Sequence, residues 1–380
     1  MHSISGKPRL LFTPGPLTTG VSTKEAMLRD LGSRDTAFIE IVRDIRQRLL
    51  QIAGVSKEDG YEAILMQGSG TFGLESVVSS TVPRDGRMLI LVNGAYGERI
   101  VTMARVLDID VRVIRFAENT PVDVGSIQRA LAEDSGITHV SVVHCETTTG
   151  LLNPVEELGA VVCDAGCHYF VDAMSSLGGM PLHMESAGID FLVTSANKCL
   201  EGVPGFSIVL ARRAALLATE GHARSLSLDL HAQWRGIERN GQFRFTPPTH
   251  TLLALEQALR DLEAEGGVTG RAARYKENHA QLVGGMEEMG FNVYLAPEHQ
   301  SHIITSFRYP DHPLFVFETF YKKLGRKGFV VYPGKLTHAD TFRIGNIGQI
   351  FPRDIGRLLD GIRETLEEMN MGFRSALASA

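Results

Sequence analysis

The sequence has no excess of positive charge. Its 380 residues include 38 lysines and arginines against 44 aspartates and glutamates, which gives a formal net charge of -6. Proteins that bind nucleic acid or an anionic membrane surface usually carry a basic patch or stripe. We therefore expect neither nucleic acid nor a membrane as a partner, and a small molecule is the more natural ligand.

Cysteine and long hydrophobic runs are also scarce. Four cysteines are too few for a disulfide framework in a chain of this length, which favours a reducing, cytoplasmic location. Cys163, Cys167 and His168 lie close together, but a structural zinc site usually needs four ligands and no second cluster lies nearby, so no metal is predicted. The apolar run at 10–12 is too short for a signal peptide or a membrane span.

The composition and the apolar pattern predict two folded domains. Hydrophobic residues make up 43% of a chain that is too long for one core, and no repeat or long linker is visible. Short apolar runs alternate with amphipathic stretches, which is typical of a mainly parallel sheet covered by helices in an α/β fold. The seven predicted strands are 63–66, 88–92, 111–114, 139–143, 169–172, 191–194 and 206–210.

After residue 248 the pattern changes, and it predicts a smaller α+β unit. Helices are expected at 252–265, 271–289 and 353–369, and short strands at 291–295, 303–307, 329–332 and 342–344. We expect an extended N-terminal arm over residues 1–20, because each proline disfavours helix at the residue before it. The predicted divisions are then a large domain over 21–270 and a small C-terminal domain over 271–380.

The first chemical motif is the segment 67–71, where a buried strand gives way to an amphipathic helix. Glycines let the backbone approach a ligand, and a helix N-terminus offers free N–H groups with a partial positive charge. A phosphate fits there, although the segment matches neither the P-loop nor the dinucleotide spacing. The segment on its own is equally consistent with a plain strand-to-helix turn.

Two further candidates follow buried strands. Asp172 ends one strand, where ligands of open α/β sheets bind, and its carboxylate could hold a pyridinium nitrogen protonated, or it could only cap the next turn. Lys198 follows the next strand among small residues, so partial loss of hydration would favour the neutral amine and Schiff-base formation. A single lysine at a strand end is more often a surface residue, and only the combination with Asp172 and the phosphate loop favours a catalytic role.

Taken together, these segments resemble the class V aminotransferases, which are fold-type I enzymes related to aspartate aminotransferase and use pyridoxal 5'-phosphate (PLP). The matching blocks run through 13–19, 67–70, 93–97, 146–150, 171–176, 195–199, 224–230, 245–251, 331–335 and 342–348. The resemblance implies that Lys198 carries the cofactor as a Schiff base and that Asp172 contacts its ring nitrogen. All the cofactor-binding residues that it implies are Gly68, Ser69, Gly70, Thr71, Tyr96, Thr148, Asp172, Asn197, Lys198 and Thr246.

The resemblance also assigns individual roles. Ser69, Gly70 and Thr71 would bind the cofactor phosphate with Asn197 beside it, Tyr96 would lie against the ring, and Thr148 would bond the ring hydroxyl. Thr246 would come from the neighbouring subunit, which implies a homodimer with shared active sites.

Arg343 would anchor the acidic group of the substrate, since a guanidinium fork suits carboxylate and phosphonate oxygens. Arg34 replaces an aromatic residue that many family members have, which puts the amino donor in doubt, although an added cation would suit a phosphonate.

The implied reaction is transamination between 2-aminoethylphosphonate and pyruvate, which gives phosphonoacetaldehyde and L-alanine. Alanine–glyoxylate or serine–pyruvate transamination would use the same cofactor residues and is the nearest alternative. A cysteine desulfurase needs a catalytic cysteine in the small domain, whereas all four cysteines here precede residue 200. A PLP-free binding protein on the same fold is a further alternative, which the lysine, the aspartate and the phosphate loop together disfavour.

Overall fold

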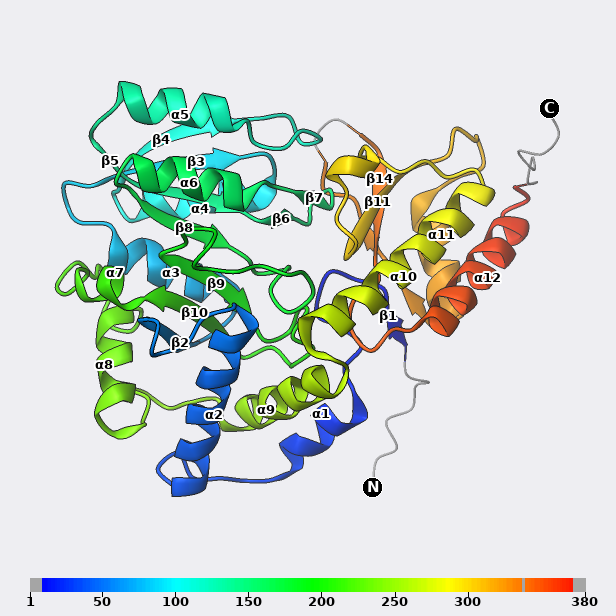
Figure 1. The fold of residues 1–380 in the computed structure, drawn as a ribbon. Helices are drawn as coiled ribbons and strands as arrows, with labels where there is room; N and C mark the ends of the chain where they lie inside the picture. The colour runs from blue at the N-terminus through cyan, green and yellow to red at the C-terminus, as the bar shows by residue number, and fades with distance from the viewer. Residues whose placement is uncertain (1–8, 337–338, 372–380) are drawn as a thin grey trace.

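A seven-stranded sheet forms the centre of the larger part of the molecule (Figure 1). The computed structural model describes residues 9–336 and 339–371. The strands are β2 (Tyr61–Gln67), β3 (Arg87–Val92), β4 (Asp110–Arg115), β5 (Ile137–Val143), β8 (His168–Asp172), β9 (Phe191–Ser195) and β10 (Phe206–Arg212). Their order is β2-β10-β9-β8-β5-β3-β4, and only β10 runs antiparallel to its neighbours. The predicted fold class, with a mainly parallel seven-stranded sheet, is confirmed.

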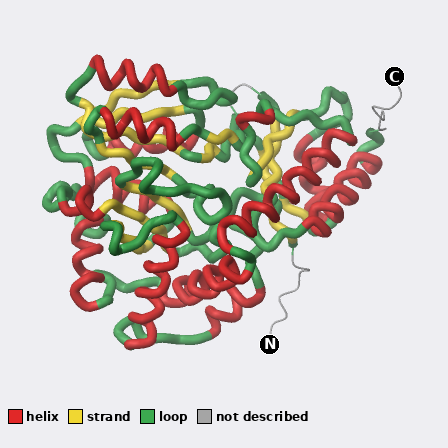
Figure 2. Tube along the Cα trace, viewed as in Figure 1, coloured by secondary structure: helices red, strands yellow, loops and turns green. Residues whose placement is uncertain are grey.

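Helices cover both faces of this sheet, so the strands between its edges are buried on two sides (Figure 2). Ala63 and Leu65 of β2 contribute to one hydrophobic core, and Ile64 and Met66 contribute to the core on the opposite face. This alternation explains why the strands are almost uninterrupted apolar runs. The helices of this part are α1 (Val21–Glu25), α2 (Thr36–Ile52), α3 (Gly70–Thr81), α4 (Ala95–Val106), α5 (Val124–Glu133), α6 (Val155–Asp164), α7 (Arg213–Leu217), α8 (Leu230–Asn240) and α9 (Thr249–Ala264).

A second, smaller sheet packs with three helices beside the first part (Figure 1). Its antiparallel strands, in the order β11-β14-β13, are β11 (Ile304–Arg308), β14 (Thr341–Gly345) and β13 (Tyr332–Pro333). The helices are α10 (Gly267–Glu288), α11 (Phe317–Arg326) and α12 (Pro352–Glu368). The strand predicted at 291–295 is wrong, because only Val293 forms a bridge, to Phe307. Helix α11 was not predicted.

The N-terminal segment joins this smaller sheet region. Strand β1 (Leu10–Leu11) pairs in parallel with β12 (Phe329–Val330), and Phe12 is fully buried in the same core. Helix α10 begins just before residue 270, so the predicted boundary falls near its start. The division of the chain at residues 20 and 270 stays a prediction. The remaining short elements are η1 (Ala26–Leu28), β6 (Cys145–Glu146), β7 (Leu151–Leu152) and η2 (Pro297–His299).

The described part of the chain has neither a membrane-spanning helix nor a group of metal ligands. No helix there is both long and apolar enough to cross a bilayer. Among the same residues, no three histidine, cysteine, aspartate or glutamate side chains are grouped so that they could hold a metal ion, and this includes the Cys163 to His168 region.

Candidate active site

The carboxyl ends of β8 and β9 open into a cavity of about 220 Å³. Asp172 is the last residue of β8, and Lys198 follows β9 in a tight turn. Because these parallel strands are neighbours, their ends bring the two side chains to one place. The predicted residues that line the cavity are Ser69, Gly70, Thr71, Tyr96, Asp172, Asn197 and Lys198.

Lys198 is held as a largely dehydrated amine. Its Nζ donates a hydrogen bond to the carbonyl oxygen of Pro14 at 2.5 Å. Burial lowers the pKa of Lys198, with Arg343 adding to the effect. A methyl group on Gly15, which has φ +119°, would lie 2.7 Å from Cδ of this lysine, so the N-terminal turn passes against the amine. An amine with a lowered pKa is a suitable nucleophile toward an aldehyde.

Asp172 is a buried carboxylate with little to neutralise it. It is 3% exposed, and its Oδ1 accepts a hydrogen bond from the Met174 N–H at 2.9 Å, while Oδ2 has no hydrogen-bond partner among the described residues. Burial raises the pKa of Asp172 to about 7, and the negative charge of Glu146 acts in the same direction. A protonated ring nitrogen in the cavity would supply the missing donor.

The start of α3 has the geometry of an anion site. Gly68 has φ +102°, a conformation that favours glycine, and it turns the chain from β2 into the helix. Ser69 is the N-cap of α3, is exposed, and makes no side-chain cap hydrogen bond. Its hydroxyl and the first N–H groups of a twelve-residue helix are therefore available to a phosphate.

Sequence reasoning assigned no role to Glu146, which joins two predicted cofactor residues. This carboxylate is fully buried, and burial raises its pKa. Oε2 accepts from the Tyr96 N–H at 3.1 Å, and Oε1 accepts from the Thr148 N–H at 3.2 Å and from the Thr148 hydroxyl. Glu146 thus caps the N-terminus of α4 from 50 residues away and fixes Thr148. A glutamate three residues after the buried strand β5 was the available signal.

Arg343 lies beside the cavity rather than in its lining. It is 1% exposed on β14, on the opposite face from the core residues Phe342 and Ile344, as predicted. Its Nε donates to the Pro333 carbonyl at 3.1 Å and its Nη1 to the Thr147 carbonyl at 2.8 Å. Burial lowers the pKa of Arg343, while an interaction with Tyr96 raises it.

The remaining predicted residues lie further out. Arg34 is exposed in the turn before α2 and does not line the cavity within the described chain. Thr246 is exposed, and its carbonyl accepts from the Gln67 side chain at 3.3 Å. Thr148 is fully buried, and its hydroxyl accepts from the Ala95 N–H at 3.3 Å. Arg99 lines the cavity and was missed.

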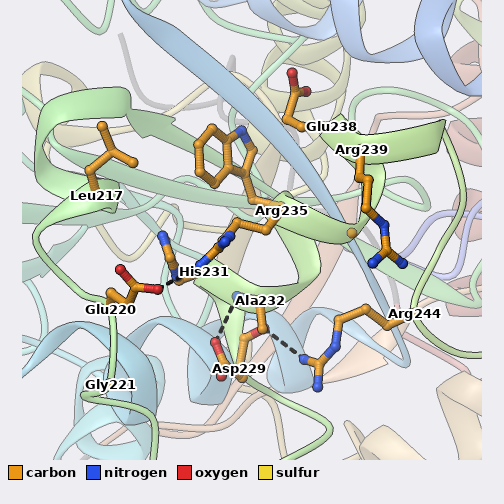
Figure 3. Close-up of a pocket in the computed structure, with 12 residues that line it drawn as sticks. Leu217, Glu220, Gly221, Asp229, His231, Ala232, Arg235, Glu238, Arg239 and Arg244 are labelled. Atoms are coloured by element: carbon orange, nitrogen blue, oxygen red, sulfur yellow. Dashed lines mark hydrogen bonds and ion pairs between the residues drawn. The ribbon is translucent and has the colours of Figure 1, made fainter.

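A larger hollow of about 930 Å³ lies along α8 and contains none of the predicted residues (Figure 3). Three of its charged groups already have partners. Asp229 accepts from the Ala232 N–H at 2.8 Å and so caps α8, and Arg235 pairs with Glu220 at 2.6 Å. This groove therefore has no chemistry comparable to that of the cavity around Lys198.

A dehydrated lysine, a buried aspartate that forms no ion pair among the described residues, and a helix N-terminus at one end of a mainly parallel sheet define a PLP-dependent enzyme of fold type I. The family model for class V aminotransferases matches residues 22–335. The chain belongs to the class V aminotransferase family, and its cofactor is pyridoxal 5'-phosphate.

Relatives and solved structures agree with this assignment. The chain is 49% identical over 359 residues to the 2-aminoethylphosphonate–pyruvate transaminase of Phocaeicola vulgatus, covering 94% of this chain and 99% of the relative. It is 48% identical to the protein of the same name from Vibrio cholerae, covering 94% and 97%. The pyridoxamine–pyruvate aminotransferase of Mesorhizobium loti superposes with a TM-score of 0.88 at 25% identity, covering 99% and 98%.

Proposed function

We propose that this aminotransferase transfers the amino group of 2-aminoethylphosphonate to pyruvate, yielding phosphonoacetaldehyde and L-alanine. The observation that carries the proposal is the near-half identity, over almost the whole chain, to relatives of that name. The enzyme would then act in the breakdown of phosphonates. When bound, the cofactor supplies an electron sink for the substrate carbon that loses its proton.

Different residues of the cavity would bind different parts of the cofactor. Lys198 would attach it through its amine, and Asp172 would keep the ring nitrogen protonated. Ser69, Gly70 and Thr71 would bind the phosphate at the start of α3, with Asn197 beside it, where free N–H groups support the role. The role of Asp172 is supported by its second carboxylate oxygen, which has no hydrogen-bond partner among the described residues. The role of Lys198 is supported by its lowered pKa.

Other residues would orient the ring and the substrate. Tyr96 would lie against the cofactor ring, and Thr148 would bond the ring hydroxyl through a free lone pair, because its proton is donated to Glu146. Arg343 would anchor the acidic group of the donor and of pyruvate in turn. Once released from the cofactor, the Lys198 amine would carry the proton between the substrate and cofactor carbons. A role for Arg34 at the mouth stays a prediction.

A homodimer is part of the proposal, with Thr246 reaching the neighbouring active site. Exposed apolar side chains flank the predicted phosphate loop, and they support a subunit interface at this surface. Phe72 is 49% exposed directly after Thr71, and Phe245 is 44% exposed beside Gln67, which donates to its carbonyl at 3.0 Å. A second subunit would bury both rings. We also propose a cytoplasmic location, in keeping with four free cysteines.

Substrate conversion by the purified, PLP-loaded enzyme tests the proposal. We expect L-alanine to form from 2-aminoethylphosphonate and pyruvate, faster than from serine and pyruvate, and faster than glycine forms from alanine and glyoxylate. If the enzyme ignores the phosphonate but uses serine or alanine, the substrate proposal is refuted and the alternative transaminase activity replaces it. The solved cysteine desulfurase that superposes is only 17% identical and indicates the shared fold alone.

A further inference from the structure

Positive charge surrounds Tyr96 at the side of the cavity that faces the smaller sheet. The guanidinium carbon of Arg99 lies 4.8 Å from the centre of the Tyr96 ring, and Nζ of Lys335 lies 5.8 Å from it. Arg343 interacts with the same side chain. Two acidic groups near these cations are engaged, since Glu98 binds Arg115 and Glu146 caps α4.

Arg343 has limited capacity for a phosphonate. Its Nε and one hydrogen of Nη1 already go to backbone carbonyls, and the guanidinium also hydrogen-bonds to Tyr96. The remaining N–H groups can hold the two oxygens of a carboxylate, which carries one negative charge. A phosphonate has three oxygens and can carry a second negative charge, which a carboxylate cannot. One partly occupied guanidinium leaves part of that charge without a partner.

Lys335 is placed to supply the missing charge. It follows β13 in the smaller sheet region and lines a hollow of about 750 Å³ with Asn93, Arg115 and Tyr294. Its side chain is exposed and forms no ion pair within the described residues. By contrast, Lys327 pairs with two glutamates on α12.

We propose that Lys335 is a specificity-determining residue that recognises the second negative charge of the phosphonate donor. This inference rests on the proposed function and deepens it. Arg343 serves both substrates, whereas Lys335 contributes only when the acidic group is a dianion. Pyruvate, with a single charge, binds through Arg343 without it. The chain thereby distinguishes a phosphonate from a carboxylate by charge, with a residue of the same subunit.

Binding of two unreactive anions of equal length tests the proposal. At an alkaline pH that removes its second proton, ethylphosphonate carries two charges and ethanesulfonate carries one, and calorimetry at that pH can measure the affinity of the PLP-loaded enzyme for each. In Lys335→Met we expect affinity for ethylphosphonate to fall about three- to tenfold, with ethanesulfonate nearly unchanged. Turnover should show the same pattern, with a lower kcat/KM for 2-aminoethylphosphonate and a similar KM for pyruvate.

Lys322→Met is the matched control, because it removes the same charge from an exposed position on α11, where Lys322 pairs with Glu318. It should change neither affinity. Equal losses for both anions, or no loss for ethylphosphonate, would overturn the role of Lys335. If the wild-type enzyme does not turn over 2-aminoethylphosphonate, the proposed function is refuted by that result alone. The affinities for the two anions still show whether Lys335 distinguishes a dianion from a monoanion.

Discussion

Asp172→Asn should stabilise the cofactor-free protein at alkaline pH, although it should impair the enzyme. Burial raises the pKa of Asp172 to about 7 in the folded chain, whereas an unfolded aspartate titrates at about 3.9. Between these values the folded state binds more protons than the unfolded state. The free energy of unfolding of the wild type therefore falls as the pH rises from about 4 to about 7.

The size of this effect follows from the pKa gap. Roughly three pH units at about 1.36 kcal/mol each give about 4 kcal/mol as an upper bound. An asparagine at 172 does not ionise and keeps an oxygen for the Met174 N–H. Urea unfolding of the cofactor-free proteins measures the free energy of unfolding of Asp172→Asn minus that of the wild type. This difference should be larger at about pH 8 than at about pH 5, by about 2 to 3 kcal/mol.

Asp190 offers the matched control. It is buried like Asp172, but it pairs with Arg212 and His168, and its pKa is lowered. Asp190→Asn should destabilise the protein at alkaline pH, which is the opposite sign. With PLP bound, Asp172→Asn should lose most of its turnover, because an amide cannot hold a ring nitrogen protonated. An advantage of Asp172→Asn that does not change with pH would refute the reasoning.

Three further substitutions test the other proposed roles. Lys198→Ala should abolish turnover and covalent attachment of the cofactor; borohydride reduction and peptide mapping of the wild type should find the cofactor on Lys198, and another lysine would contradict the site. Arg343→Lys should weaken apparent binding of both substrates by about 1.5 to 3 kcal/mol each, seen as raised Michaelis constants, and a change for one substrate alone would exclude a shared anchor. Glu146→Gln should destabilise the fold by about 1 to 3 kcal/mol in urea unfolding, because the amide directs a donor at the N–H of Tyr96 or Thr148. Glu146→Asp should recover part of that loss, and a fully stable Glu146→Gln would show that the cap is dispensable.

The large sheet could be predicted because its inner strands are buried on both faces. A strand such as β3 is apolar at every position after Arg87, so a local pattern is sufficient to find it. The pairing of β1 with β12 is harder to predict, since each strand has two residues and they pair across more than 300 positions. Segment 291–295 has buried ends, Phe291 and Leu295, yet forms a single bridge to β11. An apolar run alone does not specify a pairing partner.

The same distinction applies to the candidate site. Asp172 and Lys198 follow strand ends, which is a local feature, so they could be proposed from the sequence. Glu146, Arg99 and Lys335 acquire their positions only through tertiary contacts. Glu146 lies two residues before Thr148, which has a predicted role, but it also accepts from the Tyr96 N–H at the start of α4. No spacing rule connects a strand end with a helix N-terminus 50 residues earlier.

The turn that carries Lys198 is tied to the smaller sheet region through Glu201. The Glu201 N–H bonds the Lys198 carbonyl at 2.8 Å, and its carboxylate accepts from Arg274 at 2.8 Å and from the Tyr275 hydroxyl at 2.6 Å. Arg274 in turn donates to the Gly348 carbonyl, a few residues after Arg343, at 2.6 Å. The N-terminal segment makes a second link, since the Gly345 N–H bonds the Phe12 carbonyl near Pro14. The cofactor lysine and the proposed substrate arginine therefore belong to one hydrogen-bonded framework, although they come from different sheets.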